Sequence, residues 1–493
     1  MQLSIKKNLC ALVSCAGMCL LLSACAITAV SPPAPATAPT QFKEAVQPPA
    51  TPATPVPDNW WTVFNDPVLD DLERRVLVGN ESLKTSLAQI ANVRATLDAS
   101  YSAREPTLSA GLAATRTGNA LGSSSASASG TTTSTQNPAN NVALNATAGW
   151  ELDVWGRLSQ AIQGAQANVQ ASQSDLAAAT LSVQSTLAQT YFSMRTAEAQ
   201  KALLETTVQA YEKSLQLTQA RRFGGVATLS DELQARTQLN TAQAQLADIK
   251  AQRAQFEHAI AVLLGVPPSG LTIAANATLP EAVDVPQFLP SALLQRRPDI
   301  AAAQSRVQAA YAQIGVTDAA IFPTVSLSAN IGYSQDSLSN LLNAPNLLWT
   351  LGASLTQSIL DGGVRAQASA QARAAADLAT SSYRQLVLTS LQEVEDNLVL
   401  ATQLKSEVQW QEQALQAARK NLEITLDQYR FGTVSYLNVT TAQTAAFSAE
   451  STWLTVRNRE LAALDILLKN VAGRWDSGSS LSTTDPVRRN AAP

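Results

Sequence analysis

The chain has 493 residues, of which 46% are hydrophobic and 15% are charged, and its formal net charge is −4 at neutral pH. This slightly acidic balance offers no basic patch for nucleic acid, so no nucleic-acid partner is expected. All four cysteines lie within the first 25 residues and His258 is the single histidine, which excludes disulfides and cysteine-based metal sites from the rest of the chain. We therefore expect no metal, no cofactor and no enzymatic activity.

Residues 1–24 have the pattern of an export signal. Lys6 and Lys7 supply positive charge, and the apolar run over residues 9–22 is too short to be a membrane-spanning helix. The segment ends in Leu22-Ser23-Ala24-Cys25, which resembles the processing box of bacterial lipoproteins. Cys25 is thus the expected site of covalent lipid, an N-acyl and an S-diacylglycerol group. The alternative is an ordinary small residue near a conventional cleavage site.

Residues 25–59 combine this cysteine with a tether rich in proline, alanine and threonine. Such a composition does not bury a core, so we expect the tether to be extended and solvated. At the other end of the chain, residues 476–493 are expected to form a disordered tail.

The body of the chain between these ends is duplicated. The sequence Phe223-Gly224-Gly225-Val226-Ala227 returns as Phe431-Gly432-Thr433-Val434-Ser435, about 210 residues later. This spacing divides the body into a first repeat, residues 60–280, and a second repeat, residues 281–475. The same architecture is therefore expected twice.

Each repeat opens with a helical stretch, residues 68–103 and 298–320, that runs into a proline. Apolar and polar residues then alternate in two runs per repeat, residues 108–114 and 142–152 in the first and residues 325–333 and 347–355 in the second. Alternating runs of this length are typical of membrane β-barrel strands. By itself the alternation fits a half-buried strand of a soluble sandwich equally well.

Long helices follow the strands and decide between these alternatives. Residues 156–222 and 363–430 contain no proline and carry apolar residues at helical spacing, so each predicts a helix roughly 100 Å long. Glycine-containing turns reverse the chain into partner helices at residues 229–264 and 436–471. A soluble sandwich has no evident way to stabilise such hairpins, whereas a barrel of strands continued by a tube of helices does. Three chains of four strands each would leave a lumen, which the polar strand faces favour.

Three motifs connect these features to a known family. They are Trp150-Glu151-Leu152-Asp153-Val154-Trp155-Gly156-Arg157, Leu294-Gln295-Arg296-Arg297-Pro298-Asp299-Ile300 and Tyr429-Arg430-Phe431-Gly432-Thr433-Val434-Ser435-Tyr436-Leu437. Together they resemble the bacterial outer-membrane efflux factors, the TolC/OprM family, and in particular its lipidated subgroup. The resemblance extends from Trp60 to Gly473.

The resemblance implies a mixed α/β membrane protein in which four amphipathic strands per chain contribute to a trimeric, twelve-stranded outer-membrane β-barrel. A long periplasmic α-helical barrel continues it. The expected partners are two further copies of the chain, a periplasmic adaptor (membrane fusion protein), an inner-membrane transporter of the RND class and outer-membrane lipid. The expected location is the outer membrane of a Gram-negative bacterium, with a lipid anchor and a large periplasmic portion.

The resemblance also assigns the two helix–turn–helix tips to adaptor docking. The tip residues are Phe223, Gly224, Gly225, Val226 and Ala227 in the first repeat, and Phe431, Gly432, Thr433, Val434 and Ser435 in the second. A plain reversal of the chain is the alternative role for both turns. Asp231 and Glu232 follow the first turn and would either add negative charge there or be exposed acids that the helix dipole favours. Arg221 and Arg222 precede it and would meet acids of an adaptor or complement the helix C-terminus.

Tyr429 matches a tyrosine that helps to close the periplasmic entrance in members of this family. Family members often place aspartates at the positions of Asn438 and Thr441, so this chain departs from the pattern there. We expect a periplasmic gate closed by hydrogen bonds around Tyr429, Asn438 and Thr441 rather than by a ring of acids.

The sequence thus predicts an outer-membrane channel, the exit duct of a tripartite RND-type efflux system, which passively exports drugs or other toxic small molecules. The alternative is a lipidated periplasmic coiled-coil adaptor or structural protein. Such adaptors have one helical hairpin, not two copies each preceded by amphipathic strands.

Overall fold

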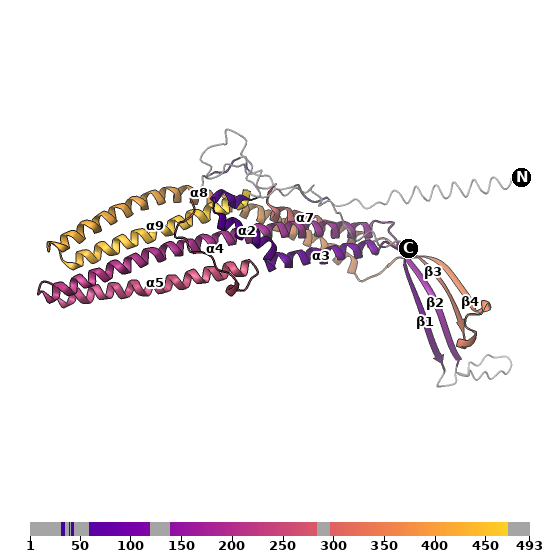
Figure 1. Ribbon diagram of the computed structural model, residues 1–493. Helices are drawn as coiled ribbons and strands as arrows, with labels where there is room; N and C mark the ends of the chain where they lie inside the picture. The colour runs from indigo at the N-terminus through magenta and orange to yellow at the C-terminus, as the bar shows by residue number, and fades with distance from the viewer. Residues whose placement is uncertain are drawn as a thin grey trace, which may run out of the picture. The chain divides into compact units, whose positions relative to one another are not determined.

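A computed structural model describes residues 31–34, 39, 41–43, 59–118, 139–282 and 296–471 (Figure 1). The predictions for the export signal, the lipid on Cys25, most of the tether and the C-terminal tail fall outside these residues. Within them, no helix is both long enough and apolar enough to cross a membrane.

The order of elements is the same in the two repeats: helix, strand pair, long helix, shorter helix. The first repeat contains η2 (Trp60–Phe64), α2 (Pro67–Gly79), α3 (Glu81–Ser102), β1 (Thr107–Thr117), β2 (Ala139–Leu152), α4 (Arg157–Phe223), α5 (Leu229–Leu263) and η3 (Pro268–Gly270). The second contains α7 (Pro298–Ala319), β3 (Thr324–Gln335), η4 (Leu338–Asn340), η5 (Ala344–Asn346), β4 (Leu347–Thr356), α8 (Val364–Arg430) and α9 (Tyr436–Val471). The predicted long helices and strand pairs are confirmed.

One predicted element is divided. The helical stretch expected over residues 68–103 is broken into α2 and α3 at Asn80, whose backbone is extended. The Asn80 side chain accepts a hydrogen bond from the amide of Leu83 at 3.1 Å and so caps α3. It also donates to the carbonyl of Leu263 at 2.7 Å, which ties the break to the end of α5. The Gly79-Asn80 pair was the available signal for this break.

The chain divides into two compact units, which we describe separately. The first unit comprises residues 31–34, 91–118, 139–170 and 304–381 among those described, and it holds an antiparallel sheet of order β1-β2-β3-β4. The strand register places apolar residues opposite one another across all four strands, for example Leu112, Leu144, Tyr333 and Leu347. One face of the sheet is therefore apolar from edge to edge.

The two faces of this sheet carry different kinds of side chain. On the polar face, Asn330 donates to the Thr147 hydroxyl at 3.2 Å, and the hydroxyls of Ser326 and Ser354 lie 2.7 Å apart. On the apolar face, Trp349 and Leu351 are largely exposed in the chain. Such an exposed apolar face requires an apolar environment to cover it.

The second unit contains most of the two long helical hairpins, α4 with α5 and α8 with α9, which run side by side in Figure 1. Residues 157–170 of α4 and 364–381 of α8 belong to the first unit. Its main core joins η2 and α2 to the middle of α4 and the end of α9. The core includes Trp60, Leu69, Leu72, Val76, Leu187, Tyr191, Phe192, Leu461, Leu464, Leu467 and Leu468. Smaller clusters, such as Val208 and Tyr211 with Leu239 and Ala242, continue the packing along the first hairpin.

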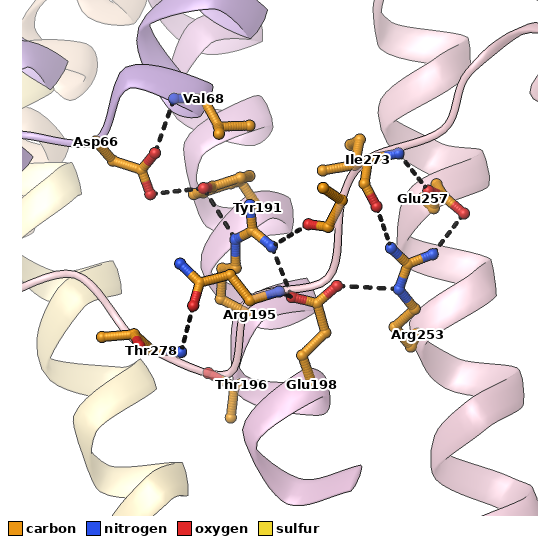
Figure 2. A network of polar contacts seen from close by, with 12 residues as sticks. Asp66, Val68, Tyr191, Arg195, Thr196, Glu198, Arg253, Glu257, Ile273 and Thr278 are labelled. Atoms are coloured by element: carbon orange, nitrogen blue, oxygen red, sulfur yellow. Dashed lines mark hydrogen bonds and ion pairs between the residues drawn. The ribbon is translucent and has the colours of Figure 1, made fainter. Parts of the chain in front are cut away.

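A buried polar network holds the segment after α5 against the first hairpin (Figure 2). Arg195, only 1% exposed, donates to Glu198 at 2.7 Å and to the carbonyl of Ala274 at 2.9 Å. Glu198 also pairs with Arg253 of α5 at 3.1 Å, and Arg253 donates to the carbonyl of Ile273 at 2.7 Å. Each charge is paired, so the network avoids the cost of an isolated buried ion.

Phe42 lies in the tether over residues 25–59 that we expected to be solvated, but its side chain is buried. Its ring is buried in the core of the second unit, and the neighbouring amide of Lys43 donates to Glu395 at 2.7 Å. Burying one aromatic ring is favourable enough to fix a short stretch of chain. The overall composition of the tether gave no sign that this one residue is buried.

Candidate functional site

The first candidate site is the turn between α4 and α5. The amide of Gly224 donates to the carbonyl of Ala220 and that of Val226 to the carbonyl of Arg221, at 3.0 and 2.9 Å. Gly225 takes the left-handed conformation with φ of 75°, as the sequence predicts for a helix-ending glycine. Thr228 and Asp231 then form a reciprocal capping box that starts α5. The turn is therefore well defined by its own hydrogen bonds.

The second turn, between α8 and α9, repeats this geometry. Gly432 is left-handed with φ of 78°, and its amide donates to the carbonyl of Tyr429 at 3.0 Å. Both the amide and the hydroxyl of Thr433 donate to the carbonyl of Gln428, at 3.0 and 2.9 Å. Gly225 and Gly432 are thus the equivalent positions of the two turns.

Each turn presents an exposed aromatic ring. Phe223 is 86% exposed and Phe431 is 84% exposed, and Val226 is also largely exposed. An exposed ring contributes nothing to the core of the chain that carries it. These residues form an apolar surface at the tips that is suited to contact with another molecule.

Tyr429 lies behind the second turn and is buried. It packs with Ala235, Tyr436 and Val439, and its ring meets that of Tyr436 edge-on at 5.5 Å. Burial raises the pKa of Tyr436 to about 12, so its hydroxyl stays neutral. The Tyr429 hydroxyl lies 3.4 Å from the hydroxyl of Thr218 on α4.

Arg221 joins the two hairpins and was not recognised from the sequence as a partner of Tyr429. Its guanidinium donates to the backbone carbonyl of Tyr429 and lies 4.5 Å from the centre of the Tyr429 ring. A cation placed over an aromatic face is attracted by the ring quadrupole. Within one chain, the end of α4 is therefore fastened to the end of α8.

Glu232 is nearly buried, which corrects the prediction of an exposed acid after the first turn. It forms ion pairs with Arg222 and, at 2.9 Å, with Arg236. Gln219 also donates to it, at 3.3 Å. Arg222 is therefore engaged within the chain, because the fold brings the end of α4 against the start of α5.

The three predicted gate residues lie in different environments. Asn438 and Thr441 are exposed, whereas Tyr429 is buried. Asn438 accepts a hydrogen bond from Ser435 at 3.0 Å, and Thr441 donates to the carbonyl of Leu437 at 3.0 Å. In the part of the chain that the structure describes, no hydrogen bond joins these three side chains to one another. Their gating role remains a prediction.

Comparison with known proteins identifies the family. The model of the family described as outer membrane efflux protein matches residues 72–266 and 289–473. The chain belongs to this family. The expected family and the expected fold class are thereby confirmed, and so is the function as an outer-membrane efflux protein. Membership of the lipidated subgroup stays a prediction.

Named relatives cover nearly the whole chain. The pyoverdine export outer membrane protein OpmQ of Pseudomonas aeruginosa is 27% identical over 464 residues, which is 93% of this chain and 96% of the relative. The cation efflux system protein CusC of Escherichia coli is 28% identical over 399 residues, 80% of this chain and 84% of the relative. Because the family model of outer membrane efflux proteins matches both repeats, the coiled-coil adaptor alternative is set aside.

Solved structures share the fold. The outer-membrane channel OprN superposes with a TM-score of 0.82 at 27% identity, covering 91% of this chain and all of that one. The Campylobacter jejuni outer membrane channel CmeC gives a TM-score of 0.86 at 20% identity, covering 93% and 97%, and supports the fold alone.

Proposed function

We propose that the chain is the outer-membrane exit duct of a tripartite efflux system and works as a homotrimer. The observation that carries the proposal is the sheet, whose apolar residues align across β1, β2, β3 and β4 and are exposed on the edge strands and partly exposed on β2 and β3. Lipid would cover that face. Because β1 and β4 lie at the ends of the strand order and open edges are not tolerated in lipid, three sheets would close into one twelve-stranded β-barrel.

The helical hairpins would continue this barrel into the periplasm as an α-helical barrel. Polar residues such as Ser326, Ser354 and Asn330 would then face the lumen of the strand barrel, which suits passive passage of solutes. A lipid on Cys25 would add an anchor in the outer membrane of a Gram-negative bacterium. The chain would hydrolyse nothing, and we expect no metal or cofactor.

The tips are proposed to receive a periplasmic adaptor that connects the duct to an inner-membrane RND transporter. The exposed Phe223 and Phe431 support this role, because each duplicate turn offers an apolar ring that the chain itself leaves uncovered. Val226 and Ala227, and Thr433, Val434 and Ser435, would complete the two docking turns around the glycines.

Substrate choice is proposed to lie outside this chain. Relatives at similar identity are named for pyoverdine export, toluene efflux and cation efflux. One fold thus serves chemically unrelated cargoes. We propose drugs or other toxic small molecules delivered by the pump, and a gate at Tyr429, Asn438 and Thr441 that is closed at rest.

The docking proposal can be tested in a strain that lacks the gene and expresses variants of this chain in its place. Phe223→Asp and Phe431→Asp should abolish resistance to a panel of antibiotics, dyes, solvents and metal ions, while the trimer still forms in the outer membrane. Val262→Asp, at an exposed apolar residue near the far end of α5, is the matched control and should export normally. Normal resistance in both tip variants would remove the tips from the mechanism.

The barrel proposal has its own test. A Cys25→Ala variant carrying a conventional signal should still require detergent, because the apolar sheet face remains. A variant that stays soluble and monodisperse without detergent would exclude a membrane barrel.

A further inference from the structure

Two acids are fully buried beside the main core of the second unit. Glu73 of α2 and Asp465 of α9 are each 0% exposed. Their neighbours on the same helical faces are core residues: Leu69, Leu72 and Val76 on α2, and Leu461, Leu464 and Leu468 on α9. Neither acid takes part in the tips, the sheet or the network of Figure 2. They therefore require a separate explanation.

Glu73 is buried without hydrogen bonds. In the described chain, neither carboxyl oxygen of Glu73 has a hydrogen-bond partner. The charged groups that act on it are Asp465 of α9 and Asp70 of α2, and both are acids. An ionised carboxylate in this position would be desolvated and would face like charge. Burial and like charge therefore favour the neutral, protonated form of Glu73 while α2 packs against α4 and α9.

Asp465 is better supported but incompletely satisfied. One of its oxygens accepts hydrogen bonds from Ser185 at 2.6 Å and Gln189 at 2.8 Å, both on α4, and the other has no partner among the described residues. The charge facing it is that of Lys469, one turn further along α9. Asp465 therefore joins α9 to α4 while it shares the core with Glu73.

Both pKa values are raised by this burial. Burial, with the charges of Asp465 and Asp70 added, raises the pKa of Glu73 from 4.5 to about 9. Burial raises the pKa of Asp465 from 3.8 to about 7, against the hydrogen bonds from Ser185 and Gln189 and the charge of Lys469. A group whose pKa rises on folding stabilises the fold fully below its unfolded pKa. That contribution falls as pH increases and is gone above the folded pKa.

We propose that Glu73 and Asp465 form a proton-dependent lock that keeps α2 docked against α4 and α9, and that loss of these protons loosens α2. The ends of α2 are fastened independently. The Tyr191 hydroxyl donates to Asp66 at 2.5 Å before the helix, and Asn80 donates to Leu263 after it. Loosening would therefore be local to the middle of the helix and would not detach it from the fold.

Cysteine reporters on α2 can test this in the full-length protein. Val76 is fully buried and Val78 is 79% exposed on the same helix, so single Val76→Cys and Val78→Cys variants compare a core and a surface thiol. The sequence has no cysteine after Cys25, and peptide mass spectrometry separates any label there from the reporter. The measured quantity is the labelling rate of the core reporter divided by that of the surface reporter.

The ratio of labelling rates should rise at least about tenfold between pH 6 and pH 9. The reason is that the loss of one proton shifts the equilibrium between docked and loosened α2 by up to tenfold per pH unit. Glu73→Gln should reduce the rise, and Glu73→Gln with Asp465→Asn should abolish it. Asp71→Asn, which neutralises an exposed acid of the same helix, should leave it unchanged. Glu73→Leu provides a second variant without a titratable group.

Two results would overturn the lock: a ratio that does not change with pH in the parent chain, or a double variant whose pH profile matches the parent. Trimer yield in detergent, measured beside each profile, separates loosening of α2 from general misfolding. Since the measurement uses no transported substrate, it can fail while the proposed export function stands.

Discussion

Arg221 in the last turn of α4 holds Tyr429 in the last turn of α8, through a hydrogen bond to its carbonyl and a position 4.5 Å from its ring centre. The two residues belong to different repeats, so the contact fastens one hairpin tip to the other within a chain. If the tips separate when the duct opens, this contact has to break. We therefore expect the resting state of the proposed gate to depend on Arg221.

We expect Arg221→Ala to weaken the closed tips by about 2 kcal/mol, since it removes a charge-assisted hydrogen bond and a cation–π contact. Passive conductance of the purified trimer in planar bilayers should increase. Arg430→Ala is the matched control, because Arg430 is exposed and pairs with Asp427 of the same helix at 3.0 Å. Equal conductance of the two variants would remove Arg221 from the gate.

The turn glycines give a second prediction. Gly225 and Gly432 are left-handed, and replacing either with alanine should cost about 1–2 kcal/mol. Gly224 differs, because a Cβ there would meet its nearest atom at 3.5 Å, an ordinary contact, and its φ is not left-handed. Thermal stability should fall for Gly225→Ala and Gly432→Ala and change little for Gly224→Ala. Similar losses of thermal stability for all three variants would show that contacts of the added methyl group, and not the left-handed backbone, determine the effect.

The buried network of Figure 2 predicts a large effect of a single charge. Arg195→Met leaves the buried Glu198 with the Arg253 guanidinium and the Asn276 amide as partners, and the loss of one of its two paired cations should destabilise the fold by about 3–5 kcal/mol. Lys201→Met removes half of the more exposed pair with Glu205, at 3.5 Å on the same helix, and should cost less than about 1 kcal/mol. Chemical unfolding of the two variants provides the comparison. A small loss for Arg195→Met would show that the segment after α5 is held mainly by its apolar contacts.

Local signals predicted the elements well but not their partners. Helical periodicity and the absence of proline were sufficient for α4 and α8, and the alternation of polar and apolar residues was sufficient for the strands. Glycine identified the turns, although the left-handed position of the first is Gly225 and not its neighbour Gly224.

The contacts that were missed join residues far apart in the chain. Nothing in the sequence near Arg221 indicates that it meets Tyr429, because the pairing depends on how the two hairpins pack. Glu232 was missed for another reason, because its partners are near in the chain: Arg236 lies one helical turn away, and Arg222 is brought to it by the reversal between α4 and α5. The burial of Glu73 and Asp465 is also a property of tertiary packing, since each stands among ordinary helical neighbours in the sequence.

The pH dependence of Glu393, a partly exposed acid of α8, has the opposite sign to that of Glu73. Glu393 of α8 accepts from Arg297 at 2.9 Å and from Lys469 at 3.4 Å. Burial alone would raise the pKa of Glu393, but the hydrogen bond from Arg297 and the charges of Lys469 and Arg297 hold it below 4.5. This ion pair therefore stabilises the fold above pH 4.5, and the contribution is lost as the pH falls through the lowered pKa.

We expect Glu393→Gln to lower the melting temperature at pH 7 and to flatten its decline between about pH 5 and pH 3, because the variant has no carboxylate to protonate. Glu423→Gln is the control, since Glu423 is exposed and pairs with Lys420 at 2.9 Å on the surface of the same helix. Its melting curve should follow that of the parent at every pH. If Glu393→Gln also follows the parent below pH 5, another carboxylate governs acid stability, and Arg297 then fastens α7 through Asp299 and Asn470 instead, at 2.7 and 2.9 Å.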